Sequence, residues 1–356
     1  MSGSKPLLMS DVREIVQLLG DTTHRLSGKT LLISGGGGFL GRYFVEVLVF
    51  LNDQVFKKPC KIVVLDKLIT SGKDSASIQD LPNVTFVEHD VVDPFQWDEP
   101  LHYIIQAAGI ASPFYYRKYP LETLEVATVG TKNMLQLAHR HHVESLLFFS
   151  SSEIYGDPDP EHVPTSESYR GNVSCTGPRA CYDESKRLGE TLCRIFHEHY
   201  GVAAKIVRPF NIYGPGMREN DYRVLPNFAS RIIAGKPLHI YGDGKPTRTF
   251  CYVSDAMNGF FRTLLEGLPG EVYNIGHTHP ETSMIDLANE LSKVWQRKIE
   301  IVLLEYPDSY PPDEPLRRCP DITKARLQLD YRPTVELSVG LERFVNWAAE
   351  TYVGTM

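Results

Sequence analysis

The chain has 356 residues, of which 42% are hydrophobic and 23% charged, and its formal net charge is −7 at pH 7. This length is sufficient for one large α/β domain and a smaller companion. The acidic balance argues against a nucleic-acid partner. The sequence has neither a long apolar run nor a signal-peptide layout, which argues against a membrane association and predicts a cytoplasmic protein.

Residues 1–28 precede the first expected strand and form an N-terminal extension. Within the extension, the segment 11–19 has the spacing of an amphipathic helix. We expect this helix to pad the core or a subunit contact.

A glycine-rich turn follows the first expected strand, Lys29–Ser34. A helix running through Tyr43 and Leu48 should begin directly after the turn. Such glycines permit a tight turn, close approach of the backbone to a pyrophosphate and close packing of helix on strand, with the phosphates at the positive end of the helix. The pattern predicts a dinucleotide site, formed by Gly35, Gly38, Phe39, Leu40 and Gly41.

The second expected strand, Lys61–Leu65, ends at Asp66. A carboxylate at this place accepts hydrogen bonds from the adenosine ribose and repels a 2′-phosphate, so the sequence favours NAD over NADP. The alternative is that Asp66 is a solvated strand end.

Strands and helices continue to alternate, which is typical of a doubly wound parallel sheet, the Rossmann architecture. The further strands are expected at 83–88, 103–106, 145–149 and 204–207, and the further helices at 121–142 and 183–200.

From residue 211 the chain becomes rich in proline and glycine, which is typical of loops that form a substrate pocket. These loops include Tyr213–Gly216, Tyr241–Gly244 and Tyr310–Pro312. We therefore expect a smaller C-terminal α/β substrate-binding domain. The expected division is 29–210 with about 246–276 for the NAD-binding domain, and about 211–245 with 277–356 for the substrate-binding domain.

Tyr182 and Lys186 are four residues apart, which places a phenol and an ammonium on one helical face. A tyrosine has an ordinary pKa of about 10, so it acts as a base near pH 7 only when a cation stabilises its phenolate. Lys186 and an oxidised nicotinamide are the two expected cations. The alternative is a chance pair on an exposed helix.

The chain resembles the extended short-chain dehydrogenase/reductase family, and within it the UDP-glucuronate decarboxylases, also called UDP-xylose synthases. The likeness extends from Lys29 to the last helix. The matching segments are His89–Pro94, Ala111–Pro113, Ser152–Pro158, Gly177–Glu184, Tyr213–Pro215, Asn220-Asp221 and Arg223-Val224.

The resemblance implies roles for residues whose own chemistry would not single them out. Arg248 and Arg318, for example, would otherwise be taken as surface arginines; a guanidinium binds phosphate or carboxylate bidentately. The implied cofactor contacts are Asp90, Val91, Ala107 and Ala108. The implied substrate contacts are Ser112, Tyr116, Asn211, Arg223, Val224, Tyr241, Arg248 and Arg318.

The chemistry implied is decarboxylation of UDP-glucuronate to UDP-xylose, or release of the 4-keto pentose. Tyr182 takes the proton of the 4-hydroxyl while NAD oxidises C4, and Ser152 stabilises the developing charge. Glu153 indicates chemistry at C5, unless it only caps the following turn, and Arg318 approaches the sugar carboxylate or the reacting carbon. No metal is expected, since the cysteines and histidines lack ligand spacing.

Two alternatives stay open on the same fold, a nucleotide-sugar 4,6-dehydratase and a 4-epimerase. A non-catalytic NAD-binding scaffold is a third. The resemblance further implies a homodimer through a four-helix bundle of the helices at 121–142 and 183–200.

Two residues depart from the family's pattern. Ala127 replaces an asparagine, so a polar support near the cofactor or the catalytic water is absent, and Gln106 replaces a histidine at a strand end.

Overall fold

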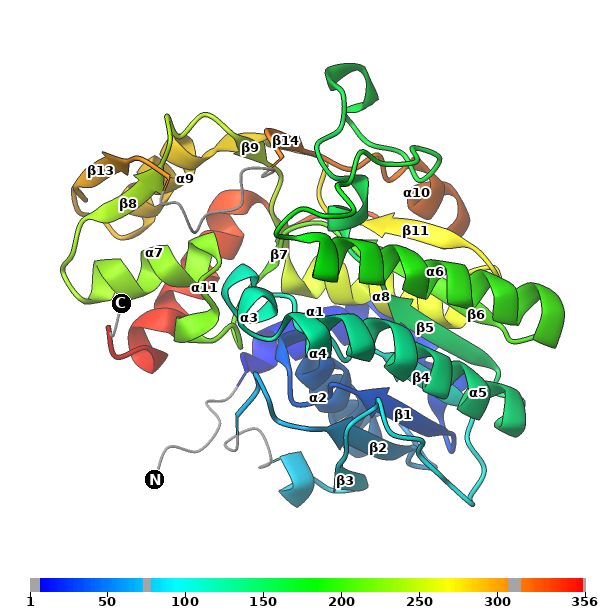
Figure 1. Ribbon diagram of the computed structural model, residues 1–356. Helices are drawn as coiled ribbons and strands as arrows, with labels where there is room; N and C mark the ends of the chain where they lie inside the picture. The colour runs from blue at the N-terminus through cyan, green and yellow to red at the C-terminus, as the bar shows by residue number, and fades with distance from the viewer. Residues whose placement is uncertain (1–6, 73–77, 307–314, 355–356) are drawn as a thin grey trace.

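The computed structural model describes residues 7–72, 78–306 and 315–354. Within these residues, a seven-stranded parallel sheet has the order β11-β6-β5-β4-β1-β2-β3 (Figure 1). The expected doubly wound sheet is confirmed, with the order reversing between β1 and β4. The strands are β1 (Thr30–Ser34), β2 (Lys61–Asp66), β3 (Val84–Glu88), β4 (Tyr103–Gln106), β5 (Ser145–Phe149), β6 (Ala204–Pro209) and β11 (Val272–Ile275).

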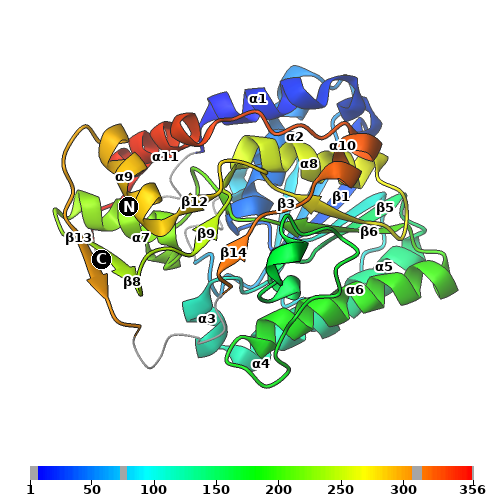
Figure 2. The ribbon, with the colours of Figure 1, turned by 90° about the horizontal axis from the view of Figure 1, so that it is seen from above.

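Helices cover both faces of the sheet (Figure 2). One face carries α1 (Met9–Leu19), α2 (Phe39–Gln54) and α8 (Val253–Glu266). The other carries α4 (Pro120–Glu125), a π-helical segment (Val126–Gly130), α5 (Thr131–His141) and α6 (Ala180–Tyr200). Each face has its own apolar core, because the β-strands are buried on both sides.

The helix expected at 121–142 is thus formed by α4, the π-helical segment and α5 in succession. It ends at His141 because His142 adopts the left-handed conformation. Helix α6 begins three residues earlier than expected, at Ala180. The amphipathic helix of the N-terminal extension is present as α1, and Val12, Ile15 and Leu19 of its apolar side are buried. A short 3₁₀ helix, Gly20–Leu26, joins it to β1.

The C-terminal part adds small sheets beside the carboxyl edge of the large one (Figure 1). They pair β7 (Ile212–Tyr213) with β10 (Cys251–Tyr252), β8 (Leu238–Tyr241) with β13 (Ile301–Leu304), and β9 (Thr247–Arg248) with β12 (Thr282–Ser283) and β14 (Arg317–Arg318). The remaining helices are α3 (Pro113–Lys118), α7 (Val224–Ile233), α9 (Met284–Val294), α10 (Thr323–Leu329) and α11 (Leu337–Thr351), with short turns at Ser152–Tyr155, Pro160–His162 and Glu219–Asp221.

The division of the chain into two domains stays a prediction. The expected loop at Tyr310–Pro312 lies outside the described residues. Among the described segments, no helix combines the length and the apolar character that crossing a bilayer requires.

Candidate active site

A cavity of about 540 Å³ opens at the carboxyl edge of the sheet, where the strand order reverses. In sheets of this kind, ligands bind at such a reversal. The glycine-rich turn lines one side of the cavity, and residues 216–221 line another. Of the predicted cofactor contacts, the lining contains Gly35, Gly38, Phe39, Leu40, Gly41, Asp66, Asp90, Val91, Ala107 and Ala108.

The glycines of the turn are required by close backbone packing. Gly35 has φ +71°, and a Cβ there would lie 2.7 Å from the Cα of Ala108. A Cβ on Gly41 would lie 2.1 Å from the carbonyl oxygen of Gly35. Gly38 precedes α2 in extended conformation, and the first residues of α2, Phe39 to Gly41, line the cavity. The first N–H groups of a helix have no acceptor within it. The turn has the shape that a pyrophosphate needs.

We expect Gly41→Ala to lose the cofactor, because the added methyl displaces the Gly35 carbonyl and with it the turn. The destabilisation should be about 1–3 kcal/mol, the usual cost of overpacking. Nucleotide content after gel filtration and a urea melt check both effects. A variant with wild-type nucleotide content would show that the turn does not hold the cofactor.

Asp66 ends β2 and ties the glycine-rich turn to the loop after the strand. Its Oδ2 accepts a hydrogen bond from the amide of Gly37 at 2.9 Å, and its Oδ1 accepts bonds from the amide of Leu68 at 2.7 Å and the hydroxyl of Ser71 at 3.1 Å. Burial raises the pKa of this carboxyl, although these donors oppose the rise. Asp66 therefore organises the cavity wall where the ribose is expected.

The turn at Asp90 and Val91 is fixed by neighbours on both sides. Asp90 forms an ion pair with Lys67. Asn133 of α5 donates to the carbonyl oxygens of Val91 and Val92 at 2.9 and 2.8 Å. Sequence reasoning missed Asn133, because its amide bonds to backbone rather than to a recognisable partner.

Gln106, one of the two departures from the family's pattern, is buried at the end of β4. It bonds to the hydroxyl of Ser34 and lies 3.4 Å from the hydroxyl of Thr131, and Ser34 also accepts the amide of Ala108 at 3.3 Å. Gln106 therefore supports the strand end from which Ala107 and Ala108 reach the cavity.

Ala127, the other departure, is buried in the π-helical segment. Its carbonyl oxygen lies 3.1 Å from the point where a Cβ on Gly189 would stand, so α6 packs closely on this segment.

Tyr182 and Lys186 of α6 are both buried, and the Lys186 nitrogen lies 5.7 Å from the centre of the Tyr182 ring. Lys186 donates to the carbonyl oxygen of Phe149 at 2.7 Å, and Phe149 lines the cavity. Tyr116 stacks on Tyr182 with a centroid distance of 5.4 Å. The expected pair therefore shares one helical face beside the cavity.

The pKa of the Tyr182 phenol is governed mainly by its burial. Burial raises the pKa of Tyr182 to about 12, and a hydrogen bond with Ser151 opposes the rise. Burial also lowers the pKa of Lys186 to about 8. In the protein alone desolvation dominates, so a phenolate near pH 7 requires a further positive charge.

The hydroxyl beside Tyr182 belongs to Ser151, one residue before the Ser152 that the sequence favoured. Ser151 has extended backbone, in which successive side chains point in opposite directions. Its oxygen also accepts the amide of Glu153 at 3.2 Å. Ser152 is buried at the start of the following turn.

Glu153 lies between two guanidinium groups. Arg318 binds both carboxylate oxygens, at 2.6 Å and 2.7 Å. Arg179 bonds to one of the same oxygens, and its Nε lies 3.7 Å from Asp183. Arg179 is buried three residues before Tyr182 and was missed by sequence reasoning, although it belongs to the matching segment Gly177–Glu184. The three residues form a charge cluster in which both arginines are buried and Glu153 is partly buried.

Only Ser112 and Arg223 among the predicted substrate contacts line the cavity. The others lie outside its lining, namely Tyr116, Asn211, Val224, Tyr241, Arg248 and Arg318. Ser112 and Arg223 line the cavity, and Asp221 joins them: its carbonyl accepts the Ser112 hydroxyl at 2.5 Å, and its carboxylate binds Arg223 at 2.5 and 2.7 Å. Arg248 is the strand neighbour of Arg318, and one of its nitrogens donates to the carbonyl of Pro315 at 2.7 Å. Arg223 and Arg248 are thus held by partners within the protein, and their substrate roles stay predictions.

Asn211, Val224 and Tyr241 do not line the cavity. The Asn211 amide donates to the carbonyl of Thr249 at 2.9 Å, and Val224 begins α7. Tyr241 is 38% exposed and stacks on Tyr306. Their substrate roles stay predictions.

Arg218 completes the wall of the cavity. Its Nη1 donates to the carbonyl of Thr70 at 2.7 Å, which connects the segment 216–221 to the loop after β2. No sequence pattern had indicated Arg218. Across the residues that the structure describes, no group of three His, Cys, Asp or Glu side chains has the arrangement of a metal site.

The comparisons with known proteins agree with this architecture. Residues 31–276 match the model of the NAD dependent epimerase/dehydratase family. UDP-glucuronic acid decarboxylase 5 of Arabidopsis thaliana is 39% identical over 316 residues, which cover 88% of each chain.

Two solved structures have a similar fold. An epimerase of Methanothermobacter thermautotrophicus has a TM-score of 0.79 at 27% identity, covering 94% of this chain and 96% of its own. The dTDP-glucose 4,6-dehydratase of Streptomyces venezuelae, solved with NAD bound, has a TM-score of 0.77 at 26% identity, covering 90% of this chain and 97% of its own. NAD, the cofactor expected from Asp66 and the glycine-rich turn, is therefore confirmed, and the chain belongs to the NAD-dependent epimerase/dehydratase family.

Proposed function

We propose that the protein decarboxylates UDP-glucuronate to UDP-xylose. The observation that carries the proposal is the charge cluster of Glu153, Arg179 and Arg318 beside Tyr182, in a chain 39% identical to a UDP-glucuronic acid decarboxylase. A carboxylate substrate needs a cationic partner near the reacting carbons, and Arg318 supplies a buried bidentate one.

The reaction begins with the 4-hydroxyl of the sugar. Tyr182 takes its proton, and Ser151 donates a hydrogen bond to the oxygen at C4. NAD held at the glycine-rich turn and Asp66 would supply the hydride acceptor and donor for C4 and a positive charge that favours the phenolate. Lys186, held by the Phe149 carbonyl, keeps a second positive charge beside Tyr182.

The resulting sugar is a β-keto acid. Its C5–C6 bond breaks, carbon dioxide leaves, and the electron pair passes to the oxygen at C4 as an enolate. Tyr182, now protonated, and Ser151 stabilise this oxygen. A proton from water then adds at C5, and reduction of C4 with return of the Tyr182 proton gives the 4-hydroxyl of UDP-xylose.

Arg318 has two possible anionic partners in this cycle, Glu153 and the sugar carboxylate. When Arg318 binds the substrate, Glu153 keeps Arg179 as its partner and stays in place near C5. Ser152 is a poor proton donor for a departing hydroxyl, which disfavours the 4,6-dehydratase alternative.

The test is incubation of the purified protein with UDP-glucuronate, UDP-glucose, GDP-mannose and dTDP-glucose, followed by mass and NMR analysis. We expect conversion of UDP-glucuronate alone, with release of carbon dioxide. Loss of water from a glucose or mannose nucleotide, or inversion at C4 with the carboxylate retained, would contradict the proposal. A protein that binds NAD and converts none of them would be a scaffold.

We also propose that the protein is a homodimer. Helices α4 and α6 and the π-helical segment lie together on one face of the sheet (Figure 2). Their exposed apolar side chains are Leu121, Leu124, Val129, Leu188 and Ile195. Leu121 is 62% exposed. Such a patch is typical of a subunit contact.

We expect Leu188→Asp to convert the dimer to a monomer, because a charge in the apolar contact is buried without a partner. Sedimentation velocity measures the change. Leu327→Asp on α10 is the matched control, since Leu327 is 75% exposed and lies on another surface. Equal sedimentation of both variants and the wild type would place the contact elsewhere.

A further inference from the structure

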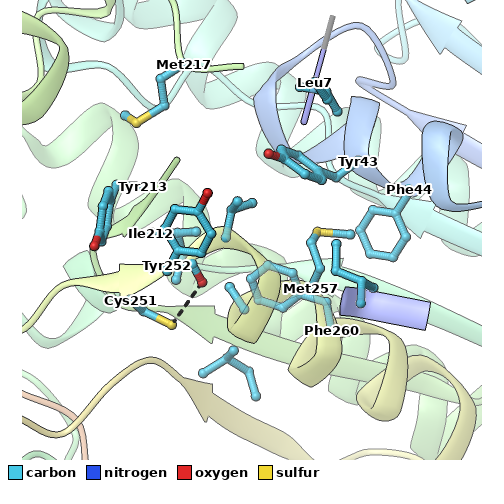
Figure 3. Close-up of a cluster of buried hydrophobic side chains, with 14 of the residues drawn as sticks. Leu7, Tyr43, Phe44, Ile212, Tyr213, Met217, Cys251, Tyr252, Met257 and Phe260 are labelled. Atoms are coloured by element: carbon cyan, nitrogen blue, oxygen red, sulfur yellow. Dashed lines mark hydrogen bonds between the residues drawn. The ribbon is translucent and has the colours of Figure 1, made fainter. Parts of the chain in front are cut away.

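The hydroxyl of Tyr43 joins three segments that are distant in the sequence. Tyr43 is fully buried in α2, the helix that follows the glycine-rich turn. Its oxygen lies 3.0 Å from the carbonyl oxygen of Pro215 and 3.3 Å from Oδ2 of Asp11 in α1. Figure 3 shows the surrounding cluster, in which Leu7, Tyr43 and Met217 are labelled.

Pro215 directly precedes the segment 216–221, which lines the cofactor cavity. Gly216, Met217 and Arg218 all line that cavity, and Arg218 continues to the carbonyl of Thr70 on its far side. The Tyr43 contact therefore fixes the distance between the helix that starts at the phosphate turn and the wall opposite it.

The N-terminal extension takes part in the same arrangement. Asp11 is fully buried, accepts the hydroxyl of Tyr252 at 2.9 Å and lies 3.6 Å from Arg343 of α11. A buried carboxyl group stays close to its hydrogen-bond donors, because losing them is costly. Asp11 therefore holds the hydroxyl of Tyr43, and with it the orientation of the ring. Leu7 packs closely on Gly216: a Cβ on that glycine would lie only 2.7 Å from the Leu7 side chain.

We propose that Tyr43, oriented by Asp11, is a positioning residue for cofactor retention, and that it slows NAD release by holding the segment 215–218 against the cavity. This inference rests on NAD binding and not on the identity of the sugar. A cofactor that is regenerated in each cycle benefits from staying bound between turnovers.

The test is the rate at which purified protein loaded with labelled NAD exchanges it for excess unlabelled NAD, measured without any sugar. We expect exchange from Tyr43→Phe to be about fivefold faster, which corresponds to the loss of one hydrogen bond of about 1 kcal/mol. Tyr331→Phe is the matched control. Tyr331 is also fully buried and lies 3.3 Å from a backbone carbonyl, that of Gly276, away from the cavity.

A thermal melt of each variant separates retention from general stability. Leu7→Ala is a second variant, which weakens the same wall without removing a buried hydroxyl, and we expect faster exchange from it as well. Unchanged exchange in both Tyr43→Phe and Leu7→Ala, or equal acceleration in Tyr331→Phe, would overturn the inference. Because no sugar is present, the result is independent of whether UDP-glucuronate is the substrate.

Discussion

Tyr182→Phe is expected to lower turnover of UDP-glucuronate by about a thousandfold or more, the range for loss of a general base, while the protein keeps its NAD. The phenol of Tyr182 is the base that we propose for the 4-hydroxyl proton. Removal of the hydroxyl alone should leave the fold intact, because Tyr116 can still stack on the phenylalanine ring.

The measurement combines steady-state turnover with nucleotide content of the same preparation. Tyr116→Phe is a useful comparison, since it alters the neighbouring ring without removing the base. Near-normal turnover in Tyr182→Phe would refute the base assignment. Loss of NAD together with turnover would instead show that the phenol serves cofactor binding.

The pH dependence follows from the same residue. Burial raises the pKa of Tyr182 to about 12, so the protein alone holds the phenol protonated at neutral pH. The rate of the first oxidation should therefore rise with pH until the phenol ionises, and in the NAD-bound enzyme this rise should occur below pH 12, because positive charge favours the phenolate.

Glu153→Gln is expected to block the steps at C5 more than the oxidation at C4. The variant keeps the size of the side chain but removes the charge that holds Arg179 and Arg318. We expect a loss of about a hundredfold or more in carbon dioxide release, with reduced cofactor accumulating on the enzyme. Rapid-mixing absorbance of the reduced nicotinamide and trapping of carbon dioxide measure the two steps.

Glu281→Gln provides the control for this variant. Glu281 binds Arg317 bidentately at 2.7 and 2.8 Å, so it is an arginine-paired carboxylate outside the cluster of Glu153, Arg179 and Arg318. Its loss should leave both steps near the wild-type rate. If Glu153→Gln slowed oxidation and decarboxylation equally, Glu153 would have no selective role at C5.

Much of the fold was predictable because the buried strands are apolar runs bounded by clear turns. Strands β1 to β6 lie where the sequence placed them, although β6 extends two residues further, to Pro209. Strand β11 and the two-residue strands such as β9 and β14 were not predicted. Such short segments carry no periodicity, and they form because tertiary packing aligns them.

The site was predictable where chemistry depends on spacing along one element. The glycine-rich turn, Asp66 and the Tyr182–Lys186 pair are examples, and the structure places them around or beside one cavity. The sequence pointed to Ser152, whereas the hydroxyl beside Tyr182 is that of Ser151. The direction of a side chain after a strand depends on the local backbone. Arg179 and Arg218 were missed, since their partners come from distant segments.

The N-terminal extension shows the same limit. Its amphipathic pattern predicted a helix that pads the core or a subunit contact, and α1 does pack its apolar side inward. The pattern could not show that Asp11 would meet Tyr43 and Tyr252, because that contact joins residues up to 241 positions apart.

If oxidation at C4 enables loss of the carboxylate, deuterium placed at C4 of UDP-glucuronate should leave that carbon and then return to it. We expect carbon dioxide release and UDP-xylose that keeps the deuterium at C4. Decarboxylated product whose C4 deuterium has been lost to solvent, or product that keeps its carboxylate, would contradict this mechanism.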